Sequence, residues 1–258
     1  MSTIALLTDF GTQDWYVAAM KAVMLRICPR AQFVDISHAV TPGDIRQAAF
    51  VLLSSYSYFP DRTVFLIVVD PGVGSERDVL VAETDSSLVV APDNGVASYM
   101  LKACSPVATC RGTNSKFMLS KLSTTFHGRD IFAPIAAHLA AGVAPAECGD
   151  PLPHPVELAW PEATITSREL KGEVVYIDRF GNAITSIDTD RLQKLPPGVY
   201  QAYLPNGMSL PVHAYYQEVA AGMPLAITGS GGLIEISINQ GNAARRLGLH
   251  IGSCIALK

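Results

Sequence analysis

Three short polar clusters supply most of the chemistry in a chain whose charged residues make up only 16% of the sequence. The first two, residues 70–77 (DPGVGSER) and 126–130 (FHGRD), together offer a carboxylate, a guanidinium and an imidazole. Such groups can orient and activate a water molecule. The third cluster, residues 178–183 (DRFGNA), offers a carboxylate, an aromatic ring and an amide, which suit an amino group or a heterocycle. The three clusters together indicate an enzyme that acts on a small molecule.

Each cluster also has a structural interpretation. Asp-Pro-Gly after a strand is a common turn, because proline fixes φ and glycine accepts a positive φ. A single histidine such as His127 is more often a surface group or a hydrogen-bonded core group than a catalyst. Asp130 has the position of a helix N-cap. The run 229–232 (GSGG) is typical of a hairpin turn, with contact to a ligand through Ser230 as the alternative.

Composition and missing motifs exclude several classes of function. The chain has no phosphate loop or dinucleotide-binding glycine motif, and its net charge of −4 offers no basic surface for nucleic acid. Its six histidines and five cysteines show no metal-ligand spacing, so we expect no metal and no disulfide framework. We also expect neither a signal segment nor a membrane span, and a cytoplasmic location.

The hydrophobic pattern predicts the strands and helices that must position the polar clusters. Over the first 150 residues, short β-branched runs alternate with amphipathic stretches, which predicts an α/β domain with a mostly parallel sheet. Asp9 and Asp70 each follow an expected strand directly, and ligands of such sheets bind beyond the carboxyl ends of the strands. The expected strands are 4–7, 33–36, 64–69, 79–82 and 88–90, and the expected helices are 15–27, 45–56, 97–103 and 131–141.

A proline-dense stretch from residue 149 to residue 161 sustains neither a helix nor a central strand. We therefore predict a domain over residues 1–150, a linker over 151–168 and a second domain over 169–258. Short strand-like runs separated by Gly, Pro and Asn predict that the second domain is a small all-β barrel or sandwich. Its expected strands are 172–177, 183–187, 199–204, 209–212, 225–228, 233–238 and 254–257, with one brief helix near 242–247.

Five motifs in order resemble the S-adenosylmethionine (SAM) hydrolases, also called SAM hydroxide adenosyltransferases. They are LTDFG (7–11), DPGVG (70–74), APDNG (91–95), FHGRD (126–130) and DRFGN (178–182), and the resemblance covers nearly the whole chain. It implies a fold related to that of the fluorinases and chlorinases, an N-terminal α/β domain joined to a C-terminal β-barrel. It also implies hydrolysis of SAM to adenosine and L-methionine, SAM being a substrate and not a cofactor, in a homotrimer with active sites between subunits.

The resemblance assigns the family's water-activating trio to Asp70, Arg77 and His127. Because the sulfonium of SAM leaves as neutral methionine, displacement at C5′ needs no general acid; it needs a better nucleophile than water, held in line. We expect Asp70 and His127 to generate or orient hydroxide, with Arg77 lowering the cost of negative charge. A site shielded from bulk water suits this charge-neutralising step.

Further residues are implied to bind the substrate. Asp9 is implied to accept hydrogen bonds from the ribose hydroxyls, and Asp14 and Asp178 to bind the methionine ammonium. Asn182 is implied to pair with an adenine edge. The remaining implied binding residues are Phe180 and Tyr216 on the faces of the adenine, and Ser230, Asn239 and Gln240 in the methionine or adenine pocket.

Two other functions compete with hydrolysis. Halide-dependent displacement of SAM, as in chlorinases, is disfavoured because the chain has Asp70, Val73 and Gly128 where fluorinases carry a tyrosine and a hydroxyl-bearing halide pocket. The chain also lacks the long fluorinase insertion before residue 88, and Gly231 replaces the arginine that follows the fluorinase serine. The other competing function is non-catalytic binding of adenosine or SAM.

Overall fold

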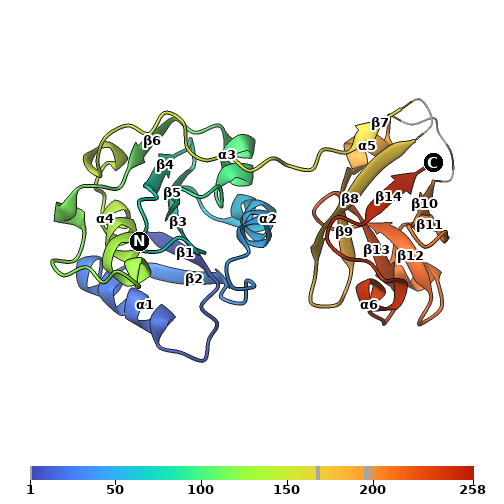
Figure 1. The fold of residues 1–258 in the computed structure, drawn as a ribbon, viewed down its shortest axis with the longest axis horizontal. Coiled ribbons are helices and arrows are strands. Elements are labelled where there is room, and N and C mark those ends of the chain that lie inside the picture. Colours follow the sequence, from blue (N-terminus) through green and yellow to red (C-terminus); the bar gives the residue numbers. More distant parts are fainter. Residues whose placement is uncertain (1, 167–168, 195–197, 199) are drawn as a thin grey trace. The chain divides into compact units, whose positions relative to one another are not determined.

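The computed structural model describes residues 2–166, 169–194, 198 and 200–258. It divides the chain into two compact units, one ending at Leu158 and the other beginning at Ala159 (Figure 1). The division falls inside the predicted linker 151–168, whose last two residues lie outside the described range.

A six-stranded sheet forms the centre of the first unit as the structure describes it. Its strands are β1 (Thr3–Thr8), β2 (Gln32–Ser37), β3 (Thr63–Val68), β4 (Val79–Glu83), β5 (Ser87–Pro92) and β6 (Ala108–Arg111), in the order β2-β1-β3-β5-β4-β6. The pairs β2–β1, β1–β3 and β3–β5 are parallel, whereas β4 is antiparallel to both neighbours. The structure therefore confirms a mostly parallel sheet, to which β6 adds a strand that the sequence pattern did not reveal.

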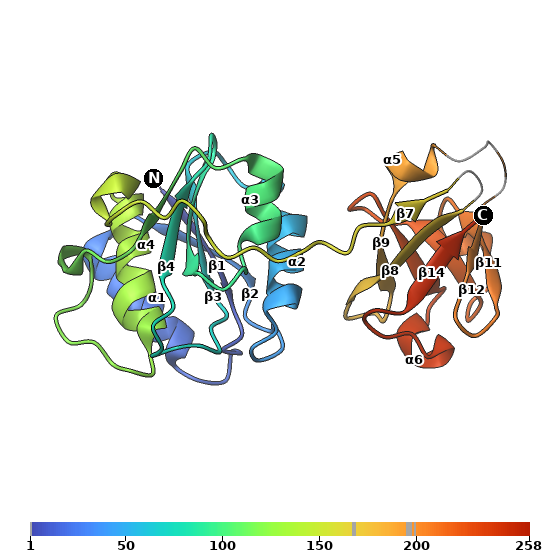
Figure 2. The ribbon, with the colours of Figure 1, turned by 45° about the horizontal axis from the view of Figure 1, so that its top comes forward.

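Helices cover both faces of this sheet. One face carries α1 (Tyr16–Ile27) and α4 (Ala133–Ala140), and the other carries α2 (Ile45–Ser55) and α3 (Ser98–Cys104) (Figure 2). Alternate residues of β3 belong to the two cores, with Leu66 packing on the side of α1 and Phe65 on the side of α2. A strand buried on both faces reads as a continuous apolar run. Shorter helical turns are Tyr56–Tyr58, Ser115–Phe117, Gly128–Phe132 and Pro145–Glu147.

The parallel register decides where the polar clusters emerge. Thr8 at the end of β1 pairs with Val68 at the end of β3. Asp9 and Asp70, which come just after these strands, therefore emerge at the same rim of the sheet, as expected.

The second unit is a closed seven-stranded barrel, as the sequence pattern predicted in outline. Its strands are β8 (Leu170–Ile177), β9 (Ala183–Asp188), β10 (Gln201–Tyr203), β11 (Ser209–His213), β12 (Pro224–Thr228), β13 (Leu233–Ile238) and β14 (Cys254–Leu257). Pairing of β14 with β8 closes the barrel, and β7 (Thr164–Ile165) pairs with β8. Short helices are α5 (Thr189–Leu192), α6 (Ala243–Leu247) and the turn Tyr216–Glu218. Val199, within the strand predicted over 199–204, lies outside the described residues.

Gly172 gives a test of barrel packing. A Cβ at Gly172 would lie 2.6 Å from Cγ1 of Ile187 and 2.8 Å from Oγ of Ser186. Because overpacking a barrel interior forces side chains off their rotamers, we expect Gly172→Ala to lower the free energy of unfolding by about 1–3 kcal/mol. Gly231→Ala is the control, since a Cβ there meets nothing within 4 Å. Equal denaturation midpoints for the two variants would contradict this packing.

Candidate active site

The loop after β3 is both a turn and a platform for two charged side chains. The Val73 N–H donates to the Asp70 carbonyl (3.2 Å), and the Ser75 N–H donates to the Gly72 carbonyl (3.0 Å). These bonds fold residues 70–77 so that the side chains of Asp70 and Arg77 meet. The turn interpretation of this cluster is therefore correct, and it does not exclude a chemical role.

Two contacts fix this loop to its surroundings. Gly74 has φ +80°, and a Cβ there would lie 2.4 Å from the Thr124 carbonyl oxygen, so only glycine fits without displacing the chain. Asn94, from the 91–95 motif, donates its side-chain amide to the carbonyl of Val69 (2.9 Å), just before Asp70. The motif at 91–95 thus acts by anchoring the end of β3.

Arg77 joins the first two polar clusters. Its Nε lies 3.0 Å from both carboxylate oxygens of Asp70, and its Nη2 donates to Oδ2 of Asp70 (2.5 Å). The same Nη2 lies 2.9 Å from Nδ1 of His127. The side chains of Arg77 and Asp70 are only 11% and 5% exposed, and the guanidinium stacks on Phe132 with 4.9 Å between its carbon and the ring centre. The structure therefore brings the predicted trio together.

This geometry fixes the protonation of His127. A guanidinium only donates hydrogen bonds, so Nδ1 of His127 must accept, and the ring proton of the neutral imidazole is on Nε2. Burial lowers the pKa of His127 below its ordinary value and the Arg77 charge lowers it further, against smaller opposing effects of Asp70 and Asp130. His127 is therefore a neutral imidazole with its N–H donor on Nε2, linked to Asp70 through Arg77.

Asp130 holds the His127 segment rather than capping a helix. Its carboxylate is fully buried and accepts from the Ser123 N–H (2.7 Å) and from Nε of Arg129 (2.6 Å). Burial alone would raise its pKa, but these hydrogen bonds and the Arg129 charge hold it below the usual value. The helix α4 begins only at Ala133, so the N-cap interpretation of Asp130 is wrong.

A cavity of about 660 Å³ lies at this rim of the sheet. Trp15, Tyr16 and Phe126 form one wall, their rings 4.9–5.7 Å apart between centres. Sequence reasoning named none of these rings as site residues, although all three flank or lie within motifs. The full lining is Asp9, Phe10, Trp15, Tyr16, Pro42, Gly43, Val68, Asp70, Pro71, Val73, Ser123, Thr125, Phe126, His127, Gly128 and Arg129.

The two other acidic candidates of this unit differ in position. Asp9 lines the cavity, and its Oδ2 accepts from the Gly43 N–H (2.8 Å), which leaves Oδ1 for a ligand. Asp14 is exposed and does not belong to the lining residues.

The barrel holds a second cavity, of about 500 Å³, lined by Phe180, Asn182, Tyr216, Ile238, Gln240 and Gly241. Four of the predicted binding residues therefore meet there. Phe180 is 75% exposed at its edge. The other three predicted residues of the barrel, Asp178, Ser230 and Asn239, are not among those lining residues.

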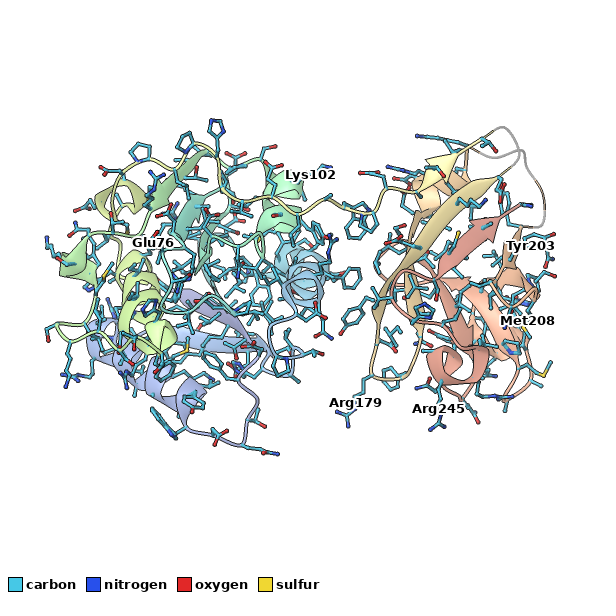
Figure 3. The ribbon with its side chains drawn as sticks, viewed as in Figure 1. Glu76, Lys102, Arg179, Tyr203, Met208 and Arg245 are labelled. Carbon is cyan, nitrogen blue, oxygen red and sulfur yellow. The ribbon has the colours of Figure 1, made fainter. Side chains whose placement is uncertain are left out.

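Asp178 and Asn182 form one unit. The carboxylate of Asp178 accepts from the backbone N–H of Asn182 (2.8 Å) and from its side-chain amide (2.9 Å). Gly181 between them has φ +87° and packs on Asn242, while Arg179 points outward from this turn (Figure 3). The backbone carbonyl of Asn182 accepts from the Asp178 N–H (3.1 Å), so its side-chain oxygen Oδ1 is the atom that remains for a ligand.

Other barrel residues have mainly structural bonds. Residues 229–232 make the hairpin turn between β12 and β13, closed by the Gly229 N–H and the Leu233 carbonyl (2.8 Å), and Asn239 donates its amide to the Val219 carbonyl (2.8 Å). Sequence reasoning missed Glu235 of β13, whose pKa is raised by burial and by Asp178, against a hydrogen bond with Tyr216.

The residues that the structure describes contain no group of three or more His, Cys, Asp or Glu side chains placed to hold a metal ion. None of their helices is both long enough and apolar enough to span a membrane.

Comparisons with known proteins agree with the motifs. Residues 4–149 match the model of the SAM hydroxide adenosyltransferase N-terminal domain, and residues 172–256 match that of the C-terminal domain. An (R)-S-adenosyl-L-methionine hydrolase of Thermus thermophilus is 38% identical over the full length of both chains, and a fluorinase of Actinoplanes is 30% identical over 78% of this chain and 76% of its own. A crystal structure of an uncharacterized conserved protein from Thermotoga maritima covers 98% of this chain and 99% of its own, with 35% identity and a TM-score of 0.93.

The Arg77–His127 contact gives a direct test. Replacing Arg77 by Met removes the cation that lowers the pKa of His127, while Asp70 and Asp130, which raise that pKa, remain. We therefore expect the pKa of His127, followed by NMR of its ring protons, to rise in Arg77→Met. Lys116→Met is the control, since Lys116 acts on the pKa of His138 instead. A His127 pKa unchanged in Arg77→Met would contradict the contact.

Proposed function

The chain belongs to the SAM hydroxide adenosyltransferase family and is a SAM hydrolase that forms adenosine and L-methionine, and we propose that Asp70, Arg77 and His127 position the attacking water. The observation that carries the proposal is the double contact of Arg77 with Asp70 and His127 at the cavity wall. It gives a water molecule one acceptor, the Asp70 carboxylate, and one donor, the Nε2–H of His127.

The reaction needs little base strength. The water oxygen forms a bond to C5′ while the C5′–S bond breaks. The electron pair of the broken C5′–S bond goes to sulfur, which leaves as neutral L-methionine. The oxygen then carries a positive charge, so its proton is strongly acidic and passes to Asp70 and on to solvent. A carboxylate suffices to accept such a proton. In-line orientation of the water is the larger contribution.

Nucleoside and methionine contacts follow the family assignments. Asp9 accepts from the ribose hydroxyls, Asn182 pairs with the adenine edge, and Asp14 and Asp178 bind the ammonium group. Phe180 and Tyr216 cover the adenine, and Ser230, Asn239 and Gln240 complete the pocket. The cavity positions of Asp9, Phe180, Asn182, Tyr216 and Gln240 support this proposal. The aromatic wall near Trp15 suits the sulfonium, because ring faces attract cations.

Each cavity offers only part of these contacts within its own unit. We propose that the enzyme is a homotrimer in which the barrel of one subunit completes the N-terminal cavity of a neighbour. Exposure of Phe180 and Trp15, at 75% and 57%, supports such an interface.

Further observations support proposals on the sulfonium epimer of the substrate and on the cellular location of the protein. The hydrolases named among the relatives act on the (R) form of S-adenosyl-L-methionine, and we propose the same sulfonium epimer for this chain. We propose that it needs no metal and no cofactor, and that it acts in the cytoplasm. Five cysteines without disulfide bonds support that reducing compartment.

Product analysis tests the function. We expect incubation of (R)-SAM in ¹⁸O-labelled water to give adenosine with one label at the 5′ oxygen, at every chloride concentration. Val73 and Gly128 line the cavity without hydroxyl groups, so neither position offers a side-chain donor to a halide. A 5′-chlorinated nucleoside would establish halide displacement, and absence of turnover with tight adenosine binding would establish a binding protein.

Subunit mixing tests the trimer. Asp70→Ala should lower kcat by a factor of about 10² or more with adenosine affinity nearly unchanged. We expect Asn182→Ala, in the barrel, to be inactive as well. Co-refolding the two variants should restore part of the activity, because some sites then combine an intact N-terminal unit with an intact barrel. Mixed oligomers that remain inactive would place each site within one chain.

A further inference from the structure

A buried set of polar side chains lies behind Asp9, outside the residues already assigned. Thr8, the last residue of β1, is fully buried, and His38, just after β2, has a side chain only 5% exposed. Oγ1 of Thr8 lies 2.8 Å from Nδ1 of His38. Neither residue lines the cavity, so their contact needs another explanation than direct binding of substrate.

His38 holds both ends of the turn that carries Asp9. At one end, the Phe10 N–H donates to Oγ1 of Thr8 (3.3 Å), and Thr8 contacts the His38 ring. At the other end, the Gly11 N–H donates to the His38 carbonyl (2.7 Å). Gly11 has φ +69°, which completes the tight turn. One residue that follows the neighbouring strand β2 thus fixes the backbone on either side of the Asp9 side chain.

The opposite side of the His38 ring faces a charged pair. Nε2 of His38 lies 3.1 Å from Oδ1 of Asp35, and Oδ2 of Asp35 accepts from Nζ of Lys21 on α1 (2.7 Å). Partial burial alone would raise the pKa of Asp35, but the hydrogen bond and charge of Lys21, together with the nearby His38 ring, hold it below the usual value. Asp35 is therefore ionised and favours a proton on Nε2 of His38.

One arrangement of donors and acceptors satisfies the buried Thr8 hydroxyl, although Nε2 of His38 itself makes no hydrogen bond. With the ring proton on Nε2, Nδ1 of His38 accepts from the Thr8 hydroxyl, whose oxygen accepts from Phe10. A proton on Nδ1 would instead leave the buried Thr8 hydroxyl hydrogen without an acceptor, which is costly. Hydrogen bonds thus run from the His38 ring through Thr8 to the Asp9 turn, and the Asp35 carboxylate lies close to the far side of the ring without a hydrogen bond to it.

We propose that Thr8 and His38 are positioning residues that act through Asp9, so that its carboxylate is held ready for the ribose hydroxyls. This inference rests on the proposed role of Asp9 in binding the nucleoside. The Gly43 N–H, which bonds to Oδ2 of Asp9, belongs to the loop that follows His38, so the carboxylate is fixed from the same segment.

The test compares Thr8→Val, which keeps the side-chain shape, with Thr8→Ser, which keeps the hydroxyl. Thr8→Val should raise KM for SAM and the Kd for adenosine about tenfold, the loss typical of a hydrogen bond that involves a charged group, with kcat nearly unchanged. Thr8→Ser should restore both values to near those of the wild type. Thr63→Val is the matched control, because its buried hydroxyl also donates one hydrogen bond, to Pro60 (2.7 Å), at the opposite end of the sheet.

A second readout separates positioning from general stability. Wild-type protein should prefer adenosine to 2′,3′-dideoxyadenosine, which lacks both hydroxyls, and Thr8→Val should lose most of that preference. Adding Thr8→Val to Asp9→Asn should cost little more, because the group through which it acts is already lost. Asp35 is partly exposed, so Asp35→Asn should be tolerated by the fold. This variant should reduce the preference for adenosine over the dideoxy analogue about threefold, less than the complete loss of a hydrogen bond to a charged group would.

The outcomes distinguish this inference from the proposed function. An unchanged adenosine preference in Thr8→Val and Asp35→Asn, or an equal loss in Thr63→Val, would overturn the positioning role. A wild-type protein that binds adenosine with this preference but does not hydrolyse SAM would overturn the function and leave the positioning role supported by the binding data. A wild type without preference for the ribose hydroxyls would overturn the role of Asp9 and the inference with it.

Discussion

Arg77 places one delocalised positive charge between a carboxylate and an imidazole, and the loops around the site are arranged to keep that charge paired and largely out of water. A buried guanidinium is tolerated only when its donors are satisfied, and here the Asp70 carboxylate, the His127 ring and the face of Phe132 surround it. Because Arg77 serves two partners, any shift of its loop changes both the acid and the imidazole. The close approach of Gly74 to Thr124 and the anchor from Asn94 to Val69 prevent such a shift.

The same arrangement explains how a mild set of groups suits the hydrolysis of a sulfonium. Asp70 and Arg77 cancel in charge, and His127 is kept neutral by burial and by Arg77. What remains is a pair of fixed hydrogen-bonding directions for one water molecule, in a cavity with an aromatic wall. A good leaving group makes orientation more valuable than strong base catalysis. Such a site depends on geometry, and backbone anchors such as the Asp130–Ser123 bond hold the His127 segment in place.

The proposed division of the site between the two kinds of unit has a physical counterpart in the fold of each unit. A parallel sheet gathers the ends of β1 and β3 at one rim, which suits charged groups supported by backbone N–H donors. A closed barrel instead offers turns such as that of Gly181, where a carboxylate and an amide are locked together and an aromatic ring is left exposed. Under the proposed function, the first unit supplies the groups for water and ribose, and the barrel supplies flat and polar surfaces for a heterocycle.

The sequence by itself determined the class of each domain and most of its elements. Periodicity predicted β3 and α2 almost to the residue. Within one strand or helix, the spacing of apolar residues in the sequence reflects which side chains are buried. It did not reveal β6, β7 or α5, which are short and partly polar, so their pairing rather than their composition defines them. The five motifs likewise identified the family, because each is a short contiguous run and their order can be read directly from the sequence.

Only the tertiary structure decided which of these groups meet. Arg77 and His127 are 50 positions apart, and their contact depends on the order of strands in the sheet and on the path of the loop that Asp130 holds. Trp15 and Tyr16 became a cavity wall, while Asp14 beside them remained exposed, because the start of α1 turns successive side chains in different directions. The contacts of His38 with the Asp9 turn could not be read from the sequence, because the pairing of β1 with β2 brings His38 and that turn together. Local patterns specify elements, whereas contacts between loops depend on how distant strands are ordered and aligned.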